Sequence, residues 1–192
     1  LYYDLVVFGT GGIYLDLVGD DLRFATRHIA EICISEDANG VVDTVYRKFK
    51  MTARAMEQQF GPGNLPTAVV KDAQNEPFKE HEIIHAVYPR GDVAGKGSKR
   101  KPIASIYYHK GTKALLSEGG FDDFPFMVPR FVKDSVSIYG RSPAMTALPD
   151  VKMLNKMSET TIRAAQKQVD PPLMAPDDGF MLPIRTTPGS LN

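Results

Sequence analysis

An α+β protein is what the sequence predicts, with a β-rich region followed by one long helix. Short apolar or β-branched runs, separated by turn residues, recur over residues 1–141. From Pro143 to Asp170 the apolar residues instead recur every three to four positions, which is the period of a helix packed on one face. With 192 residues, of which 43% are hydrophobic, the chain is long enough to bury a core.

The first expected strands lie before residue 60. They are Leu5–Phe8, Ile13–Leu15, Glu31–Ser35 and Val42–Arg47. Gly9-Thr10-Gly11-Gly12 is predicted to be a hairpin turn and not a dinucleotide-binding loop, because Tyr14 stands at the third glycine position and no helix signal follows. Asp37-Ala38-Asn39-Gly40 predicts a tight hairpin, because Asn and Gly accept the positive φ angles that such turns need.

A short helix and a second group of strands are expected next. Thr52 should cap a helix from Ala53 to Phe60, which ends at Gly61-Pro62-Gly63. The apolar signal fades between Asn64 and Pro77, and no element is expected there. Strands then resume at His81–Tyr88, Ile103–His109, Lys113–Leu116 and Phe126–Phe131.

The long helix is predicted to carry two different surfaces. Its apolar stripe is formed by Val151, Leu154, Met157 or Ser158, Thr161, Ile162, Ala165 and Val169. Its basic residues are Lys152, Lys156, Arg163 and Lys167. Pro149 is expected to start or kink this helix, and Asp170-Pro171-Pro172 to end it. Residues 171–192 are rich in proline, glycine and threonine and show no period, so the chain divides into 1–141, 142–170 and 171–192.

Composition limits the function. The 23 basic and 23 acidic residues balance, which removes the general attraction to nucleic acid that a basic domain would have. The single Cys33 offers neither an internal disulfide nor a metal knuckle and fits a reducing cytoplasm. No apolar run approaches the ~20 residues that span a bilayer. Because the chain begins at Leu1 and not at Met, we interpret it as a fragment of a longer protein.

One motif suggests an enzyme. His81-Glu82-Ile83-Ile84-His85 matches H-E-x-x-H, in which a helix places two histidines on zinc and the glutamate activates water. The β-branched Ile83-Ile84 pair and the following Ala86–Pro89 favour a strand, however, where residues four apart cannot share a metal. A zinc metallopeptidase is therefore kept only as an alternative, and the sequence predicts no catalytic residue, metal site or cofactor.

A second charged segment lies outside the helix. Lys96-Gly97-Ser98-Lys99-Arg100-Lys101 gathers positive charge in a glycine-containing loop, which could contact phosphates or an acidic neighbour. A solvated loop is the preferred interpretation. No recognition helix or aromatic stacking platform is visible, so DNA binding with sequence specificity is not expected.

Four stretches together resemble a known family. They are Asp43–Arg54 (DTVYRKFKMTAR), Ile84–Arg90 (IHAVYPR), Tyr139–Asp150 (YGRSPAMTALPD) and Arg185–Asn192 (RTTPGSLN). In their order and spacing they resemble the bacteriophage head-to-tail connecting family, the portal proteins of short-tailed phages and prophages. The resemblance extends from about Val6 to Asn192, which is nearly the whole chain.

The resemblance implies a structural protein. It implies a homo-oligomeric ring of about twelve subunits at one capsid vertex, through which DNA passes and from which the tail hangs. Residues 1–141 would be a wing, 142–170 a stem helix and 171–192 the start of a clip. Expected partners are other copies of the chain, double-stranded DNA, the terminase packaging motor, capsid or scaffold proteins and tail adaptors, with no membrane. The expected location is the virion, and the host cytoplasm during assembly.

These expectations assign roles to individual residues of the long helix. Val151, Leu154, Ile162, Ala165 and Val169 should lie between subunits, and Lys152, Lys156, Arg163 and Lys167 could contact DNA in the channel. A balanced charge suits a conduit, because each neutralised phosphate adds to binding and resists sliding. A phage tail or baseplate adaptor is the remaining alternative.

Overall fold

A computed structural model describes residues 1–19, 21–92 and 101–169. Helices and antiparallel sheets are both present, as expected for an α+β protein. The chain divides into two compact units, Leu1–Thr146 and Ala147–Asn192, and residues 147–169 of the second are described. In the described ranges no helix is long and apolar enough to cross a membrane.

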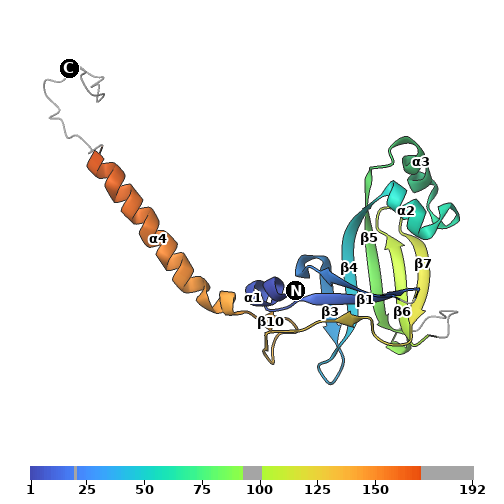
Figure 1. Cartoon of the computed structure of the whole chain (residues 1–192), viewed down its shortest axis with the longest axis horizontal. Helices are drawn as coiled ribbons and strands as arrows, with labels where there is room; N and C mark the ends of the chain where they lie inside the picture. The colour runs from blue at the N-terminus through green and yellow to red at the C-terminus, as the bar shows by residue number, and fades with distance from the viewer. Residues whose placement is uncertain (20, 93–100, 170–192) are drawn as a thin grey trace, which may run out of the picture. The chain divides into compact units, whose positions relative to one another are not determined.

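The largest element of the first unit is a five-stranded antiparallel sheet in which sequence neighbours are paired (Figure 1). Its strands are β3 (Ile32–Glu36), β4 (Val42–Thr52), β5 (Glu80–Pro89), β6 (Ile103–His109) and β7 (Ala114–Phe121). The predicted hairpin between β3 and β4 is confirmed. Gly40 has a φ of 75°, and the amide of Asp37 donates to the carbonyl of Val41 at 2.9 Å.

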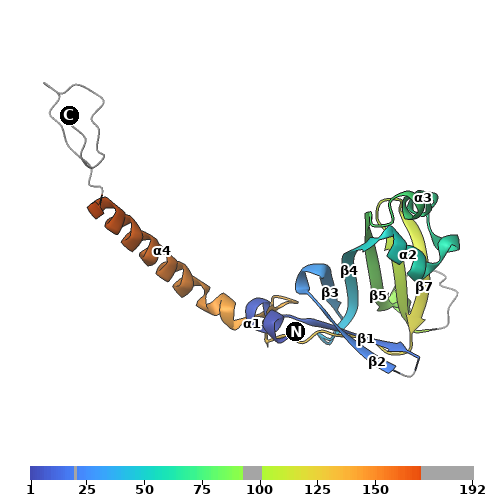
Figure 2. The same ribbon diagram turned by 45° about the horizontal axis from the view of Figure 1, so that its top comes forward.

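Two smaller sheets complete the β structure. β1 (Gly12–Val18) lies between β2 (Asp21–Arg27) and the short β8 (Phe126–Met127), and β9 (Val132–Lys133) pairs with β10 (Gly140–Arg141). Figure 2 shows the β1–β2 hairpin at one end of the five-stranded sheet and the helices α2 and α3 at the other.

The helices of this unit are short. They are α1 (Tyr2–Phe8), α2 (Ala53–Phe60) and α3 (Thr67–Asn75), with the 3-10 turns η1 (Ile29–Glu31), η2 (Pro62–Asn64) and η3 (Arg90–Asp92). The prediction for α2 is confirmed at both ends. The Thr52 hydroxyl accepts a hydrogen bond from the amide of Ala55 at 3.4 Å, and Gly61 follows the last helical residue.

Two apolar clusters form the core on one face of the five-stranded sheet. The first joins the small sheet to β3, β4 and β5 through Tyr14, Ile32, Ile34, Val42, Val45, Val87 and Phe126. The second packs α2 and α3 on β5 and β7 through Ala53, Met56, Phe60, Leu65, Val69, Ile83 and Leu116. Ile83, His85 and Val87 lie on the same face of β5, and the buried His85 is between the other two. The two clusters therefore meet at His85.

Several expectations need correction. Leu5–Phe8 is part of α1 and not a strand, so Gly9 ends a helix and does not turn a hairpin. Asn64–Pro77 contains α3, so the described part of residues 1–141 holds three α-helices where one was expected. The expected strand Phe126–Phe131 is regular only in β8, with an isolated bridge between Thr10 and Arg130 further on, because prolines at 125 and 129 lack the amide that a ladder needs.

A close backbone crossing joins the start of this unit to its end. Gly9 has a φ of 77°, and a Cβ added there would lie 2.4 Å from the carbonyl oxygen of Gly140. The amide of Gly140 donates to the Thr10 hydroxyl at 2.8 Å. The Ser142 hydroxyl donates to the carbonyl of Val7 at 2.8 Å and accepts from the amide of Met145 at 2.9 Å. Only glycine permits this approach at both positions.

Candidate functional site

The long helix is the most exposed element that the structure describes. α4 (Pro143–Val169) starts after Ser142, contains Pro149 within it, and has no buried residue. The expected helix is thus confirmed over these residues, while Asp170 and the segment 171–192 lie outside the described ranges. A helix of this length whose apolar side chains are all in solvent lacks the packing that normally stabilises helices. Its surface is therefore a candidate binding surface.

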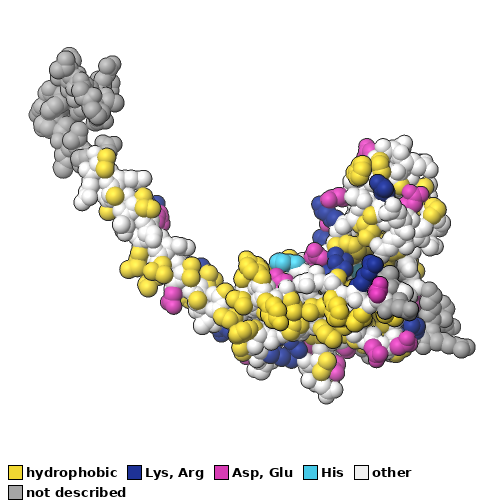
Figure 3. Space-filling model, in the orientation of Figure 1, with side chains coloured by type: hydrophobic (Ala, Val, Ile, Leu, Met, Phe, Trp, Pro, Cys, Tyr) yellow, Lys and Arg dark blue, Asp and Glu magenta, His cyan; other side chains and the backbone are white. Residues whose placement is uncertain are grey.

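The two predicted surfaces of α4 lie on opposite sides. At about 100° per residue, Val151, Leu154, Ile162, Ala165 and Val169 fall within an arc of about 80°. The four basic residues fall within about 60°, centred roughly 150° from the stripe. The exposed fraction of the stripe runs from 47% at Val151 to 87% at Val169. Figure 3 shows hydrophobic side chains along the face of the helix that is in view.

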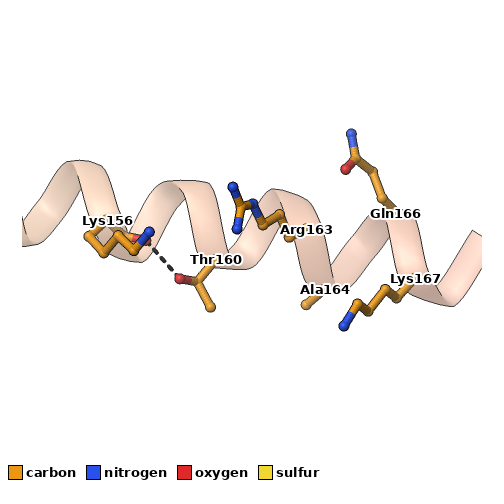
Figure 4. Close-up of a pocket in the computed structure, with 6 residues that line it drawn as sticks. All are labelled: Lys156, Thr160, Arg163, Ala164, Gln166 and Lys167. Atoms are coloured by element: carbon orange, nitrogen blue, oxygen red, sulfur yellow. Dashed lines mark hydrogen bonds between the residues drawn. The ribbon is translucent and has the colours of Figure 1, made fainter.

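The basic side of α4 carries little excess charge. Glu159 forms an ion pair with Lys156 at 3.0 Å and another with Arg163 at 2.5 Å. Among the described residues, Lys152 and Lys167 have no ion-pair partner. A pocket on this side is lined by six residues of the helix, whose side chains Figure 4 shows: Lys156, Thr160, Arg163, Ala164, Gln166 and Lys167. A polar, open surface with a small positive surplus suits weak contacts with phosphates better than tight binding.

The H-E-x-x-H segment lies in β5, so the geometry of a zinc peptidase is not formed. His81, Ile83 and His85 share one face of the strand, and Glu82 and Ile84 share the other, as predicted. His85 bonds to the hydroxyl of Ser105 at 2.9 Å. Within the described ranges no group of three or more potential ligands could hold a metal.

His81 instead belongs to a polar network that the sequence did not reveal. The amide of Thr112 donates to His109 Nδ1 at 3.2 Å, so that nitrogen carries no proton. His109 Nε2 must then donate to His81 Nδ1, which is 3.3 Å away. Nε2 of His81 lies 3.4 Å from Asp72 Oδ2 on α3 but is buried without a hydrogen-bond partner. The His81–His109 contact joins β5 to β6, and burial lowers the pKa of His109, with His81 adding to the effect.

The second basic segment lies mostly outside the part of the chain that the structure describes. Residues 96–100 of this loop lie outside the described ranges, and Lys101 pairs with Asp122 at 2.8 Å. α4 therefore remains the candidate site.

Comparisons with known proteins agree with the resemblance. The family described as "Bacteriophage head to tail connecting protein" matches residues 1–192. The "Portal protein" of Salmonella phage epsilon15 is 33% identical over 183 residues, covering 92% of this chain and 33% of that protein. The "Probable portal protein" of Bordetella phage BPP-1 is 30% identical over 201 residues, covering 100% of this chain and 36% of that protein. The chain spans about a third of these relatives' length. It belongs to the bacteriophage head to tail connecting protein family.

Proposed function

We propose that the protein containing this chain is a portal, a ring of about twelve subunits that conducts DNA into and out of the phage head and carries the tail. The observation that supports this most directly is α4, a helix of 27 residues with no buried side chain. Its apolar stripe needs a partner, and in a ring the neighbouring subunits supply one on each side.

The two sides of α4 are assigned different roles. Val151, Leu154, Ile162, Ala165 and Val169 pack against neighbouring subunits, which removes their side chains from water. Lys152, Lys156, Arg163 and Lys167 face the channel and make weak contacts with DNA phosphates. The small positive surplus lets DNA slide, whereas a strongly basic lining would hold it.

The remaining regions follow the same architecture. Residues 1–141 form the wing, 142–170 the stem and 171–192 the start of the clip. The terminase motor, capsid or scaffold proteins and tail adaptors are the proposed partners, and the portal vertex of the virion is the proposed location, after assembly in the host cytoplasm. The protein acts structurally, with neither catalytic residues nor a cofactor.

Ring assembly of the full-length protein tests this proposal. Leu154→Asp places a charge in the stripe, and burying it unpaired costs several kcal/mol. Met153→Asp is the matched control, because Met153 is equally exposed (58% against 60%) but points away from the stripe. Electron microscopy should show rings of the wild type and of Met153→Asp, and few rings of Leu154→Asp.

Two outcomes would contradict the proposal. Equal ring yield from both variants would show that the stripe is not part of the interface between subunits. Full-length protein that stays monomeric and binds only to preassembled rings would instead indicate a tail or baseplate adaptor.

A further inference from the structure

A row of polar side chains separates the two apolar clusters. Arg47 on β4 is opposite His85 on β5, which in turn is opposite Tyr107 on β6. On the same face of β5, Ile83 belongs to the helix-covered cluster and Val87 to the cluster under the small sheet. The row therefore lies at the boundary between the two clusters.

The small sheet contributes two more side chains to this row. Tyr14 on β1 packs edge-on against His85, with ring centroids 6.0 Å apart. The guanidinium carbon of Arg27, on β2, lies 5.9 Å from the centre of the Tyr14 ring. The charge of Arg47 helps to lower the pKa of Arg27, and both charges lower the pKa of His85. Two guanidinium groups thus approach one space from two sheets.

The donors around this space are largely unused. Nε of Arg47 bonds to Glu31 Oε2 at 2.9 Å, and its guanidinium stacks 3.9 Å from the Phe49 ring. Within the described residues, the terminal nitrogens of Arg47, the guanidinium of Arg27 and the hydroxyls of Tyr14 and Tyr107 have no hydrogen-bond partner. Arg27, Arg47 and Tyr107 are each partly exposed, whereas Tyr14 is buried at 9% exposure.

The charged side chains around Arg27 and Arg47 could be balanced by one further negative group. Arg27 and Arg47 have Glu31 as the near carboxylate, and Glu31 already binds Arg47. Asp16 also acts on Tyr14 and Tyr107 but lies further along β1, opposite the exposed Arg23. Burial raises the pKa of both tyrosines, which therefore remain protonated donors. Burial also disfavours the charge of Arg27, and a bound anion would offset that cost.

We propose that Arg27, Arg47, Tyr14 and Tyr107 form a binding site for a single oxyanion, a carboxylate or a phosphate. Guanidinium groups bind both through paired N–H donors, and phenol hydroxyls can donate to the remaining oxygens. Two sources provide such a group, namely free phosphate and an acidic side chain of a second copy of this chain.

Phosphate titration of the full-length protein tests the first source. Calorimetry at constant ionic strength should show saturable binding of inorganic phosphate to the wild type, weakened at least about tenfold by Arg27→Gln. Arg23→Gln is the matched control, because Arg23 lies on the same strand and face but pairs across from Asp16. It should leave the affinity within about twofold. Tyr107→Phe, which removes only one oxygen, should also weaken binding.

The second source predicts a different pattern. If a neighbouring copy supplies the carboxylate, assembled rings bind no phosphate, but Arg27→Gln and Tyr107→Phe raise the protein concentration needed for rings and Arg23→Gln does not. The proposal is overturned if phosphate does not bind and ring assembly is unchanged in both variants. It does not depend on the portal function, because the phosphate arm is measured whether or not rings form.

Discussion

The imidazole of His85 stacks face to face on the phenol ring of Tyr107, with centroids 4.0 Å apart and 3° between the planes. His85 is 2% exposed. Burial, followed by the charges of Arg47 and Arg27, lowers the pKa of His85 from 6.5 to about 4. The neutral imidazole is therefore the form that the folded sheet accepts.

Acid should consequently destabilise the fold. Because the pKa of His85 is lower in the folded than in the unfolded chain, its contribution is complete above pH 6.5 and is lost as the pH falls towards 4. The expected loss in free energy of unfolding between pH 7 and pH 5 is about 2 kcal/mol. His85→Gln keeps an amide for Ser105 without titrating, so urea unfolding of this variant should show a flatter pH profile. A profile as steep as that of the wild type would assign the effect to other groups, such as His109.

Two neighbouring isoleucines test the β5 strand directly. Ile83 is 0% exposed in the helix-covered cluster, and Ile84 lies half-buried on the opposite face. Ile83→Ala should lower the free energy of unfolding by about 2–5 kcal/mol through the cavity it leaves, and Ile84→Ala by clearly less. Chemical unfolding of both variants measures the difference. Equal losses would indicate that the two residues do not alternate between faces.

The N-cap of α2 should make a measurable contribution to the stability of the protein. Thr52→Ala removes the acceptor for the Ala55 amide and should cost about 1 kcal/mol. Thr67→Ala provides the control, because Thr67 is exposed at the start of α3, where no side chain caps the helix. Thermal unfolding should therefore separate the two variants, and a Thr67→Ala variant that is equally destabilised would argue against capping as the cause.

The backbone crossing should not tolerate a methyl group. A Cβ at Gly140 would lie 2.2 Å from the carbonyl oxygen of Gly9, so Gly140→Ala should destabilise the protein by about 2 kcal/mol or more. Gly63→Ala meets nothing within 4 Å and is the control. Differential scanning calorimetry gives both melting temperatures. Similar values for the two variants would mean that the crossing can relax.

Charge on α4 should affect the movement of DNA. Replacing both Lys152 and Lys167 by glutamine removes the two cations without an ion pair in the described chain, and should flatten the salt dependence of DNA binding while rings still form. Lys156→Gln, which leaves Glu159 with Arg163, is the comparison and should have the smaller effect. An unchanged salt slope and unchanged packaging would place the channel lining elsewhere in the full-length protein.

Local chemistry explains what the sequence could predict. The Asn39-Gly40 turn and the Thr52 cap depend on residues within five positions of each other, so their signals are complete in the sequence. The strand interpretation of His81–Tyr88 succeeded because β-branched residues and alternation both favoured it. The α4 stripe was visible because 3.6-residue periodicity extended over many turns.

Contacts between residues far apart in the sequence explain which features the sequence could not predict. Leu5–Phe8 has β-forming residues, but Asp4 is buried beside His28 at 3.6 Å and Val7 is bound by Ser142, which stabilise α1. α3 was missed because Val69 alone is buried in it. The proposed anion-binding row was invisible, since Arg47 and Tyr107 meet His85 only through strand register, and Arg27 approaches only by its contact with Tyr14.

The crossing of Gly9 and Gly140 also determines an order of events during synthesis. The meander β3 to β7 uses one contiguous stretch and only neighbouring pairings, so it can form before the rest of the chain has left the ribosome. Thr10 and Val7 bond to partners 130 and 135 residues later. Thr10 and Val7 precede the meander in sequence but are therefore among the last of the described residues to reach their native contacts, and the base of α4 becomes anchored at the same moment.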